Sequence, residues 1–277
     1  MDVKDSPRPG SALGQYSTDE AVRIRTETHQ KYGVGGGEPM FRAITRAMLE
    51  VAPLPAAILD VGAGTGNWYR ASREELGPDP WYTGLDQSRG MVESLTLTLN
   101  GDARGTALVG DAEALPFGDG SFSWVGMHIM LYHVPHIQLA LAEGWRVLPS
   151  GGVLTAATNA ATPYRELWAL GNAVADAFGL PGLNDPVSFN LTNGAAFFPV
   201  PPTLRIFAGG FRFPEAAPAL RYMASGPLWD HLGDASRDPE LRRRALDLLN
   251  ERIEAVIRRN GVFQVHSEMG FFLAVKP

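Results

Sequence analysis

One stretch, residues 57–67, constrains the fold more than any other part of the sequence. It reads AILDVGAGTGN. The apolar run at 57–61 predicts a short buried strand, and the glycines at 62, 64 and 66 let the backbone turn tightly and approach a ligand closely. Residues 67–76 can then form a helix. A strand, a tight loop and a helix in this order are typical of the carboxyl edge of a parallel sheet, where nucleotide-like ligands bind.

Two common nucleotide-binding motifs do not fit this stretch. The dinucleotide fingerprint G-x-G-x-x-G requires glycine or alanine at the position that Asn67 occupies. No Gly-Lys-Ser/Thr follows the glycines, so the stretch is not a P-loop. From these residues alone, a glycine turn that merely connects a strand to a helix remains an alternative.

Acidic residues end three successive predicted strands. They are Asp60, Asp86 at the end of 81–86, and Asp111 after 106–109, so the acids recur after 26 residues (60 to 86) and 25 residues (86 to 111). A carboxylate at such a strand end can accept two hydrogen bonds from a ribose diol. Further strands are expected at 122–127 and 153–158. This alternation of strands and helices predicts a parallel, doubly wound sheet with right-handed crossovers.

Three segments of the chain resemble the class I S-adenosylmethionine (SAM)-dependent methyltransferases, in particular the methyltransferase type 11 or UbiE-like small-molecule subgroup. Residues 58–66 resemble motif I of that family, residues 110–117 (GDAEALPF) its adenine-receiving segment, and residues 131–135 (LYHVP) its loop after the fourth strand. The resemblance covers about residues 57–158. It implies a Rossmann-like, mostly parallel seven-stranded sheet with an antiparallel C-terminal strand, an N-terminal lid helix and an inserted cap.

The resemblance also implies a cofactor-binding set and the cofactor itself, S-adenosyl-L-methionine. Glycines 62 and 64, together with Gly66, are expected to cradle the methionine end. Asp60 is expected near the methionine amino group, and Asp86 on the ribose. The full set consists of Tyr16, Arg25, His29, Asp60, Gly62, Ala63, Gly64, Asp86, Gln87, Asp111, Ala112, Met127 and His128.

The remaining members of this set are expected around the adenine and under the cofactor. Gln87 is expected to flank the adenine, and Asp111 to accept a hydrogen bond from its exocyclic amine. The Ala112 backbone is expected beside the ring. Met127 and His128, at the end of the fourth strand of the core, are expected to lie beneath the cofactor.

A polar helix is predicted from Ser17 to about Lys31, because Ser17 and Glu20 have capping-box spacing. Arg25 and His29 are four residues apart and share one face of it. With Tyr16 they resemble the lid helix that closes over the SAM pocket in one subgroup of small-molecule methyltransferases. A solvated surface helix is the alternative.

His133 is the first candidate for a catalytic base, since an oxygen or nitrogen acceptor can require proton removal and histidine titrates near neutrality. A pocket-shaping His133 is the alternative, and His29 is the second catalytic candidate. His128, Tyr132 and His136 are weaker candidates. No metal site is expected, because His128, His133 and His136 have no recognised ligand spacing and no thiolates nearby.

Five domains are expected in order along the chain: a disordered leader at 1–14, N-terminal lid helices at 15–52, the SAM-binding core at 53–159, a cap or substrate wall at 160–235, and a C-terminal helix with edge strands at 236–277. Helices are expected at 163–178 and from Asp238 to about residue 260. Strands are expected within 204–213 and, around Gly270, at 263–267 and 271–275. Aromatic residues in and near the cap are candidates for lining an apolar acceptor pocket: Trp168, Phe189, Phe197, Phe198 and Trp229.

The composition excludes several classes of function. The formal net charge is −6 with no long basic run, which disfavours tight binding to nucleic acid. The absence of cysteine excludes disulfides and thiolate sites. No run approaches the roughly 18 apolar residues of a membrane helix, and residues 1–14 lack the apolar core of a secretion signal. We therefore expect a cytoplasmic protein that is a monomer or homodimer and associates with neither nucleic acid nor membrane.

These observations lead to one predicted function and two alternatives. The prediction is methyl transfer from SAM to the O, N or C nucleophile of a small molecule, such as an aromatic or hydrophobic secondary metabolite. The first alternative is a tRNA or protein methyltransferase. The second is a SAM-binding cyclase or regulatory protein that does not methylate.

Overall fold

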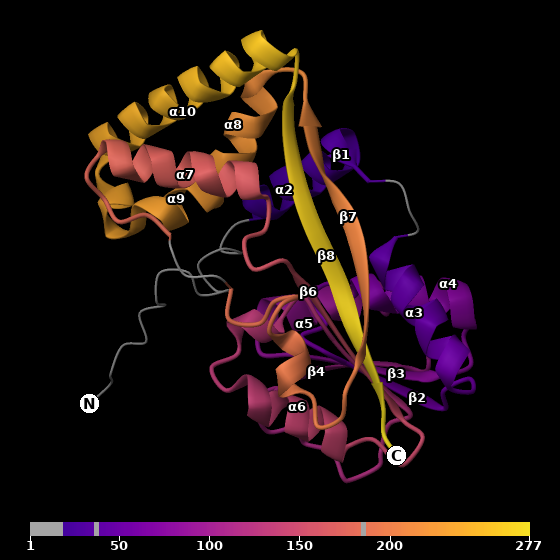
Figure 1. The fold of residues 1–277 in the computed structure, drawn as a ribbon. Coiled ribbons are helices and arrows are strands. Elements are labelled where there is room, and N and C mark those ends of the chain that lie inside the picture. The colour runs from indigo at the N-terminus through magenta and orange to yellow at the C-terminus, as the bar shows by residue number, and fades with distance from the viewer. Residues whose placement is uncertain (1–18, 36–38, 184–186) are drawn as a thin grey trace. The chain divides into compact units, whose positions relative to one another are not determined.

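The computed structural model describes residues 19–35, 39–183 and 187–277 (Figure 1). Contacts group these residues into two compact units. The first unit consists of residues 19–35, 162–183 and 208–268, and the second of residues 39–161, 187–207 and 269–277. The chain therefore passes between the units several times. The linear domain boundaries given above remain a prediction.

The second unit contains the parallel strands that the sequence predicts. Their hydrogen-bonded order is β6-β5-β2-β3-β4, and β8 pairs with β6 in the antiparallel sense. In the β2–β3 register, Asp60 lies beside Gly84. The bounds are β2 (Ala57–Val61), β3 (Trp81–Asp86), β4 (Gly105–Val109), β5 (Trp124–His128), β6 (Val153–Asn159) and β8 (Phe263–Val275).

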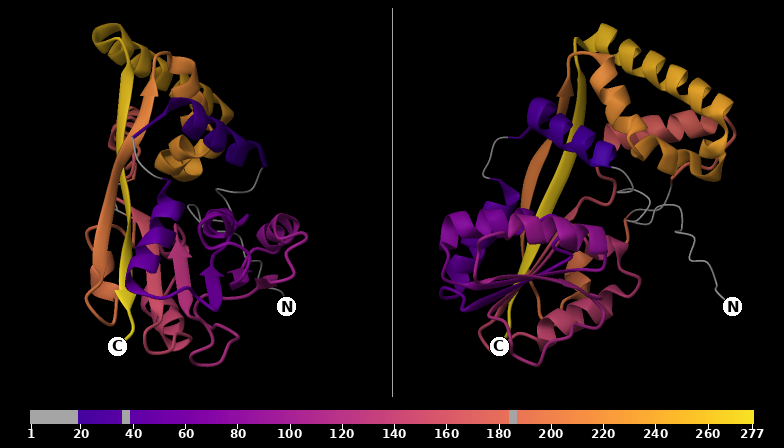
Figure 2. Two further views of the ribbon diagram at one scale, coloured as in Figure 1. Left: turned by 90° about the vertical axis from the view of Figure 1, so that its right-hand side faces the viewer. Right: turned by 180° about the vertical axis from the view of Figure 1, so that it is seen from behind.

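Helices cover both faces of these strands, as the doubly wound fold requires (Figure 2). On one face, buried side chains of helices α3, α4 and α5 pack on Ile58, Tyr82 and Trp124. On the other face, α6 packs on Leu59 and Val125. The helices are α3 (Met40–Val51), α4 (Asn67–Leu76), α5 (Arg89–Thr98) and α6 (Ile137–Arg146), and two 3₁₀ turns are η1 (Leu131–His133) and η2 (Gly194–Phe197).

The first unit is mainly helical and has its own apolar core. Its longest helix begins after Asp238, whose carboxylate accepts from the Glu240 N–H at 2.9 Å, and ends at Gly261 in a left-handed conformation. The helices are α2 (Asp19–Tyr32), α7 (Arg165–Ala177), α8 (Ala216–Ala224), α9 (Pro227–Leu232) and α10 (Pro239–Asn260), with the 3₁₀ turn η3 (Gly233–Arg237). The strand β1 (Gly33–Val34) and parts of β7 (Thr203–Phe213) and β8 complete it.

The described residues form eight strands, in the order β1-β7-β8-β6-β5-β2-β3-β4, where the sequence predicts seven. The additional strand is the two-residue β1, which pairs with Phe211 and Gly210. The Rossmann-like class and the antiparallel C-terminal strand are confirmed. The expectation of two short strands around Gly270 is wrong, because β8 runs through this residue without a break. A Cβ at Gly270 would lie 2.3 Å from the Arg205 carbonyl oxygen of β7, so this glycine permits close pairing.

Two further observations concern the ends of helices and the search for membrane-spanning helices. Pro39 precedes α3 as its N-cap residue. The predicted cap at Ser17 lies outside the described residues, as does the leader 1–14. In the described part of the chain, no helix has the length and apolar character needed to cross a membrane.

Candidate cofactor site

The glycine loop after β2 adopts left-handed backbone conformations at Gly62, Gly64 and Gly66, with φ of 69°, 54° and 86°. A Cβ at Gly62 would lie 2.7 Å from Met130 Cγ, and a Cβ at Gly66 would lie 2.8 Å from Leu95 Cδ1. At Gly64 a Cβ would meet no atom within 4 Å. The left-handed backbone and the close packing of neighbouring side chains therefore both favour glycine at positions 62 and 66. The open space beside Gly64 is where a ligand can approach the backbone.

Asp86, at the end of β3, holds this loop. Its Oδ2 accepts from the Gly64 N–H at 3.0 Å, and its Oδ1 accepts from the Ser88 N–H at 2.9 Å. Each carboxylate oxygen has two lone pairs, so each keeps acceptor capacity for a ligand hydroxyl. The next residue, Gln87, is exposed. The structure thus brings the predicted methionine-binding loop and the predicted ribose acceptor into contact.

Asp60 is buried at the end of β2, with only 3% of its surface exposed. The Tyr82 hydroxyl donates a hydrogen bond to its Oδ2. Burial raises the pKa of Asp60 to about 7; the Tyr82 hydrogen bond opposes this shift and the nearby Asp86 charge adds to it. Ala63, in the adjacent loop, is also buried and donates its N–H to the Leu85 carbonyl.

The predicted adenine segment forms a short turn after β4. Asp111 is exposed and accepts from the Glu113 N–H at 2.9 Å, while Ala112 is buried in the core on the α6 side of the sheet. Glu113 in turn accepts from the His136 backbone N–H at 2.8 Å and pairs with its Nδ1 at 2.8 Å. These hydrogen bonds hold the pKa of Glu113 below its usual value. They tie the adenine segment to the loop after β5.

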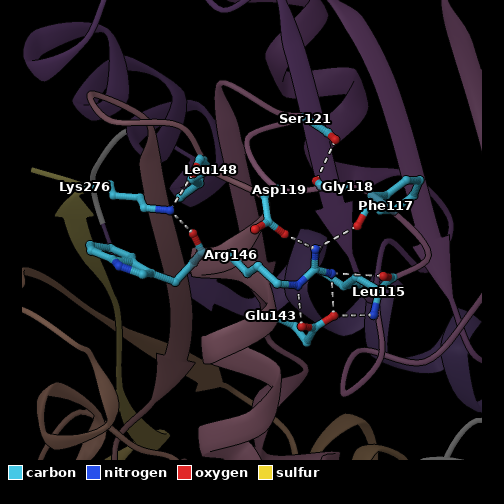
Figure 3. A network of polar contacts seen from close by, with 10 residues as sticks. Leu115, Phe117, Gly118, Asp119, Ser121, Glu143, Arg146, Leu148 and Lys276 are labelled. Atoms are coloured by element: carbon cyan, nitrogen blue, oxygen red, sulfur yellow. Dashed lines mark hydrogen bonds and ion pairs between the residues drawn. The ribbon is translucent and has the colours of Figure 1, made fainter.

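A second network anchors the end of this segment to α6 (Figure 3). The guanidinium of Arg146 donates to both oxygens of Glu143, to Asp119 Oδ1 at 2.8 Å and to the Phe117 carbonyl at 2.8 Å. Glu143 Oε2 also accepts from the Leu115 N–H at 2.8 Å. A planar guanidinium satisfies this set because its donors form a fixed fork. No local sequence pattern marks this network, since Arg146 lies 27 to 31 residues from Asp119, Phe117 and Leu115.

Met127 and His128 point to opposite faces of β5. The Met127 side chain is fully buried in the core beneath α6, so only its backbone can face a ligand. His128 packs on Trp68, with ring centroids 4.5 Å apart, and its Nε2 lies 2.9 Å from Thr155 Oγ1. Burial lowers the pKa of His128 to about 3, so the ring is neutral at physiological pH. Among the described residues, its buried Nδ1 has no hydrogen-bond partner.

The chain turns sharply after β5. Ile129 has φ of 58°, a left-handed conformation that is unfavourable for a β-branched residue. The turn brings Met130 against Gly62 and leads into the η1 turn that ends at His133. Such strain concentrates at functional sites, and no sequence signal marked it. His133 packs on Tyr132 with ring centroids 4.4 Å apart, and burial lowers its pKa to about 4.

None of the predicted lid residues belongs to the described part of the second unit. Tyr16 lies outside the described residues, and Arg25 and His29 belong to the first unit. There the His29 ring packs on Phe211, with centroids 4.8 Å apart, and His29 remains an exposed residue. Burial, and then the charge of Arg25, lower its pKa. The lid role of these residues remains a proposal.

The aromatic residues expected to line an acceptor pocket mostly serve the cores. Phe189 and Phe198 are buried against Phe272 in the second unit. Trp168 and Trp229 donate their indole N–H groups to backbone carbonyls of the first unit. Over the described ranges, no group of three or more His, Cys, Asp or Glu side chains could hold a metal ion.

Comparison with known proteins agrees with the geometry of the second unit. Residues 58–152 match a family model described as "Methyltransferase domain". The demethylmenaquinone methyltransferase of Listeria monocytogenes serotype 4a (strain HCC23) is 38% identical over 99 residues, which are 35% of this chain and 42% of that protein. The match therefore spans less than half the length of this curated relative.

Two solved structures share the fold over most of the chain. One is a provisionally named methyltransferase from Bacillus halodurans C-125, with a TM-score of 0.55 and 18% identity over 85% of this chain and 99% of that one. The other is the [4+2]-cyclase SpnF, with a TM-score of 0.52 and 16% identity over 99% of both chains. Residues 58–152 are therefore similar to methyltransferase domains, and the chain shares the overall fold of these two solved structures.

Proposed function

We propose that this protein is an enzyme that transfers a methyl group from SAM to a small-molecule acceptor. One observation carries the proposal: the Asp86 carboxylate holds the Gly64 N–H beside open space at the left-handed glycine loop. A loop that only connected a strand to a helix would need no such tie. The similarity of residues 58–152 to methyltransferase domains supports the same reading.

The residues of the second unit fit this cofactor in shape and chemistry. The loop at Gly62, Ala63 and Gly64 would accommodate the methionine end, because nothing fills the space beside Gly64. Asp86 would accept from the ribose hydroxyls with the lone pairs that the backbone leaves free. Asp60 would face the methionine amino group. When bound, the sulfonium supplies an already activated methyl group.

The adenine would lie by Gln87, Asp111 and Ala112, held in place by the Glu113 and Arg146 networks. Because these networks already fix the adenine segment, little conformational entropy would be lost when the cofactor binds. His128, neutral and buried, and the backbone of Met127 would lie on the cofactor's underside.

The chain's contribution to the reaction is to orient the acceptor and exclude water. His133 would face the acceptor in a neutral form able to accept a proton or a hydrogen bond. Its low pKa makes it a weak base, which favours a positioning role for His133 over full proton removal. Tyr16, Arg25 and His29 are proposed to close over the site, with His29 the second candidate base.

We further propose an aromatic or hydrophobic acceptor with an O, N or C nucleophile, such as a secondary metabolite. The relatives named demethylmenaquinone methyltransferase support a small-molecule acceptor, since their name gives demethylmenaquinone as the compound that is methylated. The net charge of −6 weighs against a nucleic-acid acceptor.

Calorimetric titration of the full chain with SAM, S-adenosylhomocysteine and NAD tests the cofactor. Micromolar binding of the first two, with none of NAD, is the expected result. A screen of apolar aromatic acceptors by mass spectrometry then tests transfer, with a gain of one methyl in the product. Tight SAM binding with turnover but no methyl gain would instead identify a SAM-binding cyclase.

Asp86→Ala should weaken SAM binding by about 1–3 kcal/mol, the scale of losing hydrogen bonds to a charged group. Asp79→Ala, which removes an exposed acid of the same unit, is the matched control and should leave affinity unchanged. Equal affinities of a folded Asp86→Ala variant and the wild type would remove Asp86 from the site.

A further inference from the structure

The hydrogen bond from Tyr82 to Asp60 joins two fully enclosed side chains. Tyr82 is 1% exposed and Asp60 3% exposed, and among the described residues the Tyr82 hydroxyl is the one side-chain group that donates to this carboxyl group. A carboxylate held by a single donor in an apolar setting is poorly stabilised, because it can accept about four hydrogen bonds. The pair is therefore unusual for a purely structural contact.

The strand register explains how the phenol reaches the acid. Ile58 lies beside Tyr82, and Asp60 beside Gly84, so all four residues face the same side of the sheet. Gly84 has no side chain, and a Cβ there would lie 3.3 Å from Tyr82 Cε1 and 2.4 Å from Leu95 Cδ2. Glycine thus leaves room for the Tyr82 ring to reach along the strand toward Asp60.

The ring is fixed from its other side by α4. Tyr69 packs edge-on against Tyr82, with centroids 4.9 Å apart, and its own hydroxyl donates to Asp102 Oδ2 at 2.8 Å. Arg73 also pairs with Asp102, at 2.8 Å. The two tyrosines therefore have different partners: only Tyr82 donates to Asp60.

The charged and titratable groups around the pair favour a neutral acid when no cofactor is bound. The Asp86 carboxylate disfavours a second negative charge. His128, on the same face of the neighbouring strand β5, is neutral because its pKa is about 3. Arg73 is paired with Asp102, so its charge is largely compensated. The groups that face Asp60 and Tyr82 from the packed elements are thus Asp86, Tyr69, Asp102, Arg73 and His128.

We propose that Tyr82 is a positioning residue that holds Asp60 in the cofactor site, and that binding of the cofactor's ammonium group releases the proton of Asp60 to solvent. This inference rests on the proposed function. The Tyr82 hydroxyl remains the donor in both states, and the ammonium supplies the opposite charge that a buried carboxylate otherwise lacks. Because the pKa of Asp60 is about 7, the release falls near neutrality.

Calorimetry of S-adenosylhomocysteine and of SAM binding to the full chain tests this proposal. Titrations at pH 5.5 to 7.5, each in two buffers of different ionisation enthalpy, measure both affinity and proton release. Below pH 7.5 the ligand's own α-amino group stays mostly protonated, since such groups titrate at about 7.7–8.0. For wild type we expect affinity about 25-fold weaker at pH 5.5 than at pH 7.5, as linkage predicts for one proton, and a binding heat that differs between buffers.

Three variants separate the roles. Asp60→Asn should bind with nearly pH-independent affinity and no buffer-dependent heat. Tyr82→Phe should raise the midpoint of the pH dependence by about one unit, because it removes a hydrogen bond to the charged form. Tyr69→Phe, the matched control, keeps the Tyr82 hydroxyl and should leave the midpoint unchanged.

The possible failures are distinguishable. No binding of either ligand at pH 7.5 would overturn the proposed function itself. Binding with the same affinity and heat at every pH and in both buffers would overturn only this inference. Equal midpoints for Tyr82→Phe and wild type would remove Tyr82 from the role. If Tyr82→Phe does not fold, the comparison of wild type with Asp60→Asn still decides whether Asp60 releases a proton.

Discussion

Gly126→Ala is expected to damage the centre of the second unit, although it adds a single methyl group. Gly126 lies in the middle of β5, and a Cβ there would lie 2.3 Å from Trp68 Cζ3 and 2.4 Å from His128 Cε1. Real Cβ atoms do not approach other heavy atoms so closely, so both rings, or the strand itself, must move. The alanine side chain thus tests how rigidly these rings are held.

Both rings are anchored by buried hydrogen bonds. The Trp68 indole N–H donates to Thr45 Oγ1 at 3.0 Å, and His128 Nε2 pairs with Thr155 Oγ1 at 2.9 Å. Overpacking a core costs about 1–3 kcal/mol, and loss of one buried hydrogen bond adds about 1 kcal/mol. Replacing glycine in a strand returns about 0.5–1 kcal/mol. The expected net loss in the free energy of unfolding is therefore about 2 kcal/mol, within a range of about 1–3.5 kcal/mol.

Urea unfolding followed by far-ultraviolet circular dichroism measures this loss, and calorimetry should show a lower melting temperature for the second unit. Gly144→Ala is the matched control, since it also adds one methyl group to a buried glycine. There the Cβ would lie 2.6 Å from Met127 Cε, the mobile end of a flexible side chain. Alanine also gains about 1 kcal/mol over glycine within a helix, so the control should lie within about 1 kcal/mol of wild type.

The comparison of the two variants decides the outcome. If Gly126→Ala is no less stable than Gly144→Ala, the Trp68 and His128 rings have freedom that the packing does not indicate. Rigid packing would then not be what holds His128 in its proposed place beneath the cofactor. A destabilised Gly126→Ala that still binds SAM normally would separate the core role of His128 from its proposed site role.

Three further predictions concern charged or titratable groups. Arg146→Lys should lower the melting temperature and weaken S-adenosylhomocysteine binding in calorimetry. A lysine ammonium cannot reproduce the several hydrogen bonds that the planar guanidinium of Arg146 donates. Unchanged values would show that the network in Figure 3 is dispensable. Asp60→Asn should become more stable relative to wild type as the pH rises from about 4 to 7, by up to about 4 kcal/mol. The reason is that the pKa of Asp60 is higher in the folded than in the unfolded protein, so wild type loses stability when folded Asp60 has to ionise. Urea unfolding at several pH values checks the sign. His133→Gln should keep the shape of the kcat profile between pH 5 and 8, because His133 with a pKa of about 4 does not titrate there; disappearance of a limb in that range would contradict this.

Much of the second unit was predictable because its signals are local. The apolar runs before Asp60, Asp86 and Asp111 predict the strands, and the alternation with helices predicts the parallel order of β2, β3 and β4. The glycines after β2 marked a tight turn, and they adopt left-handed backbone there, which costs glycine no steric strain. The contact between Gly64 and Asp86 follows from two strand ends that meet at one edge of a sheet.

The sequence pattern was less informative where a contact depends on another element. Gly270 suggested a break, because glycine weakens a strand; the close pairing with Arg205 gives it a different role. Ile129 carried no turn signal, since β-branched residues disfavour the left-handed conformation that the fold imposes on it. The assignments of Tyr16, Arg25 and His29 to a lid remain predictions.

By itself, the sequence determined the strand–glycine loop–helix unit, the acids at three strand ends and the family to which they point, because each depends on residues within a few positions of one another. Only the tertiary structure decided that Tyr82 donates to Asp60, that Arg146 gathers the adenine segment onto α6, and that three separate segments form one helical unit. Those contacts join residues 22 or more positions apart. Strand register and packing bring such residues together, and neither is encoded in a local pattern.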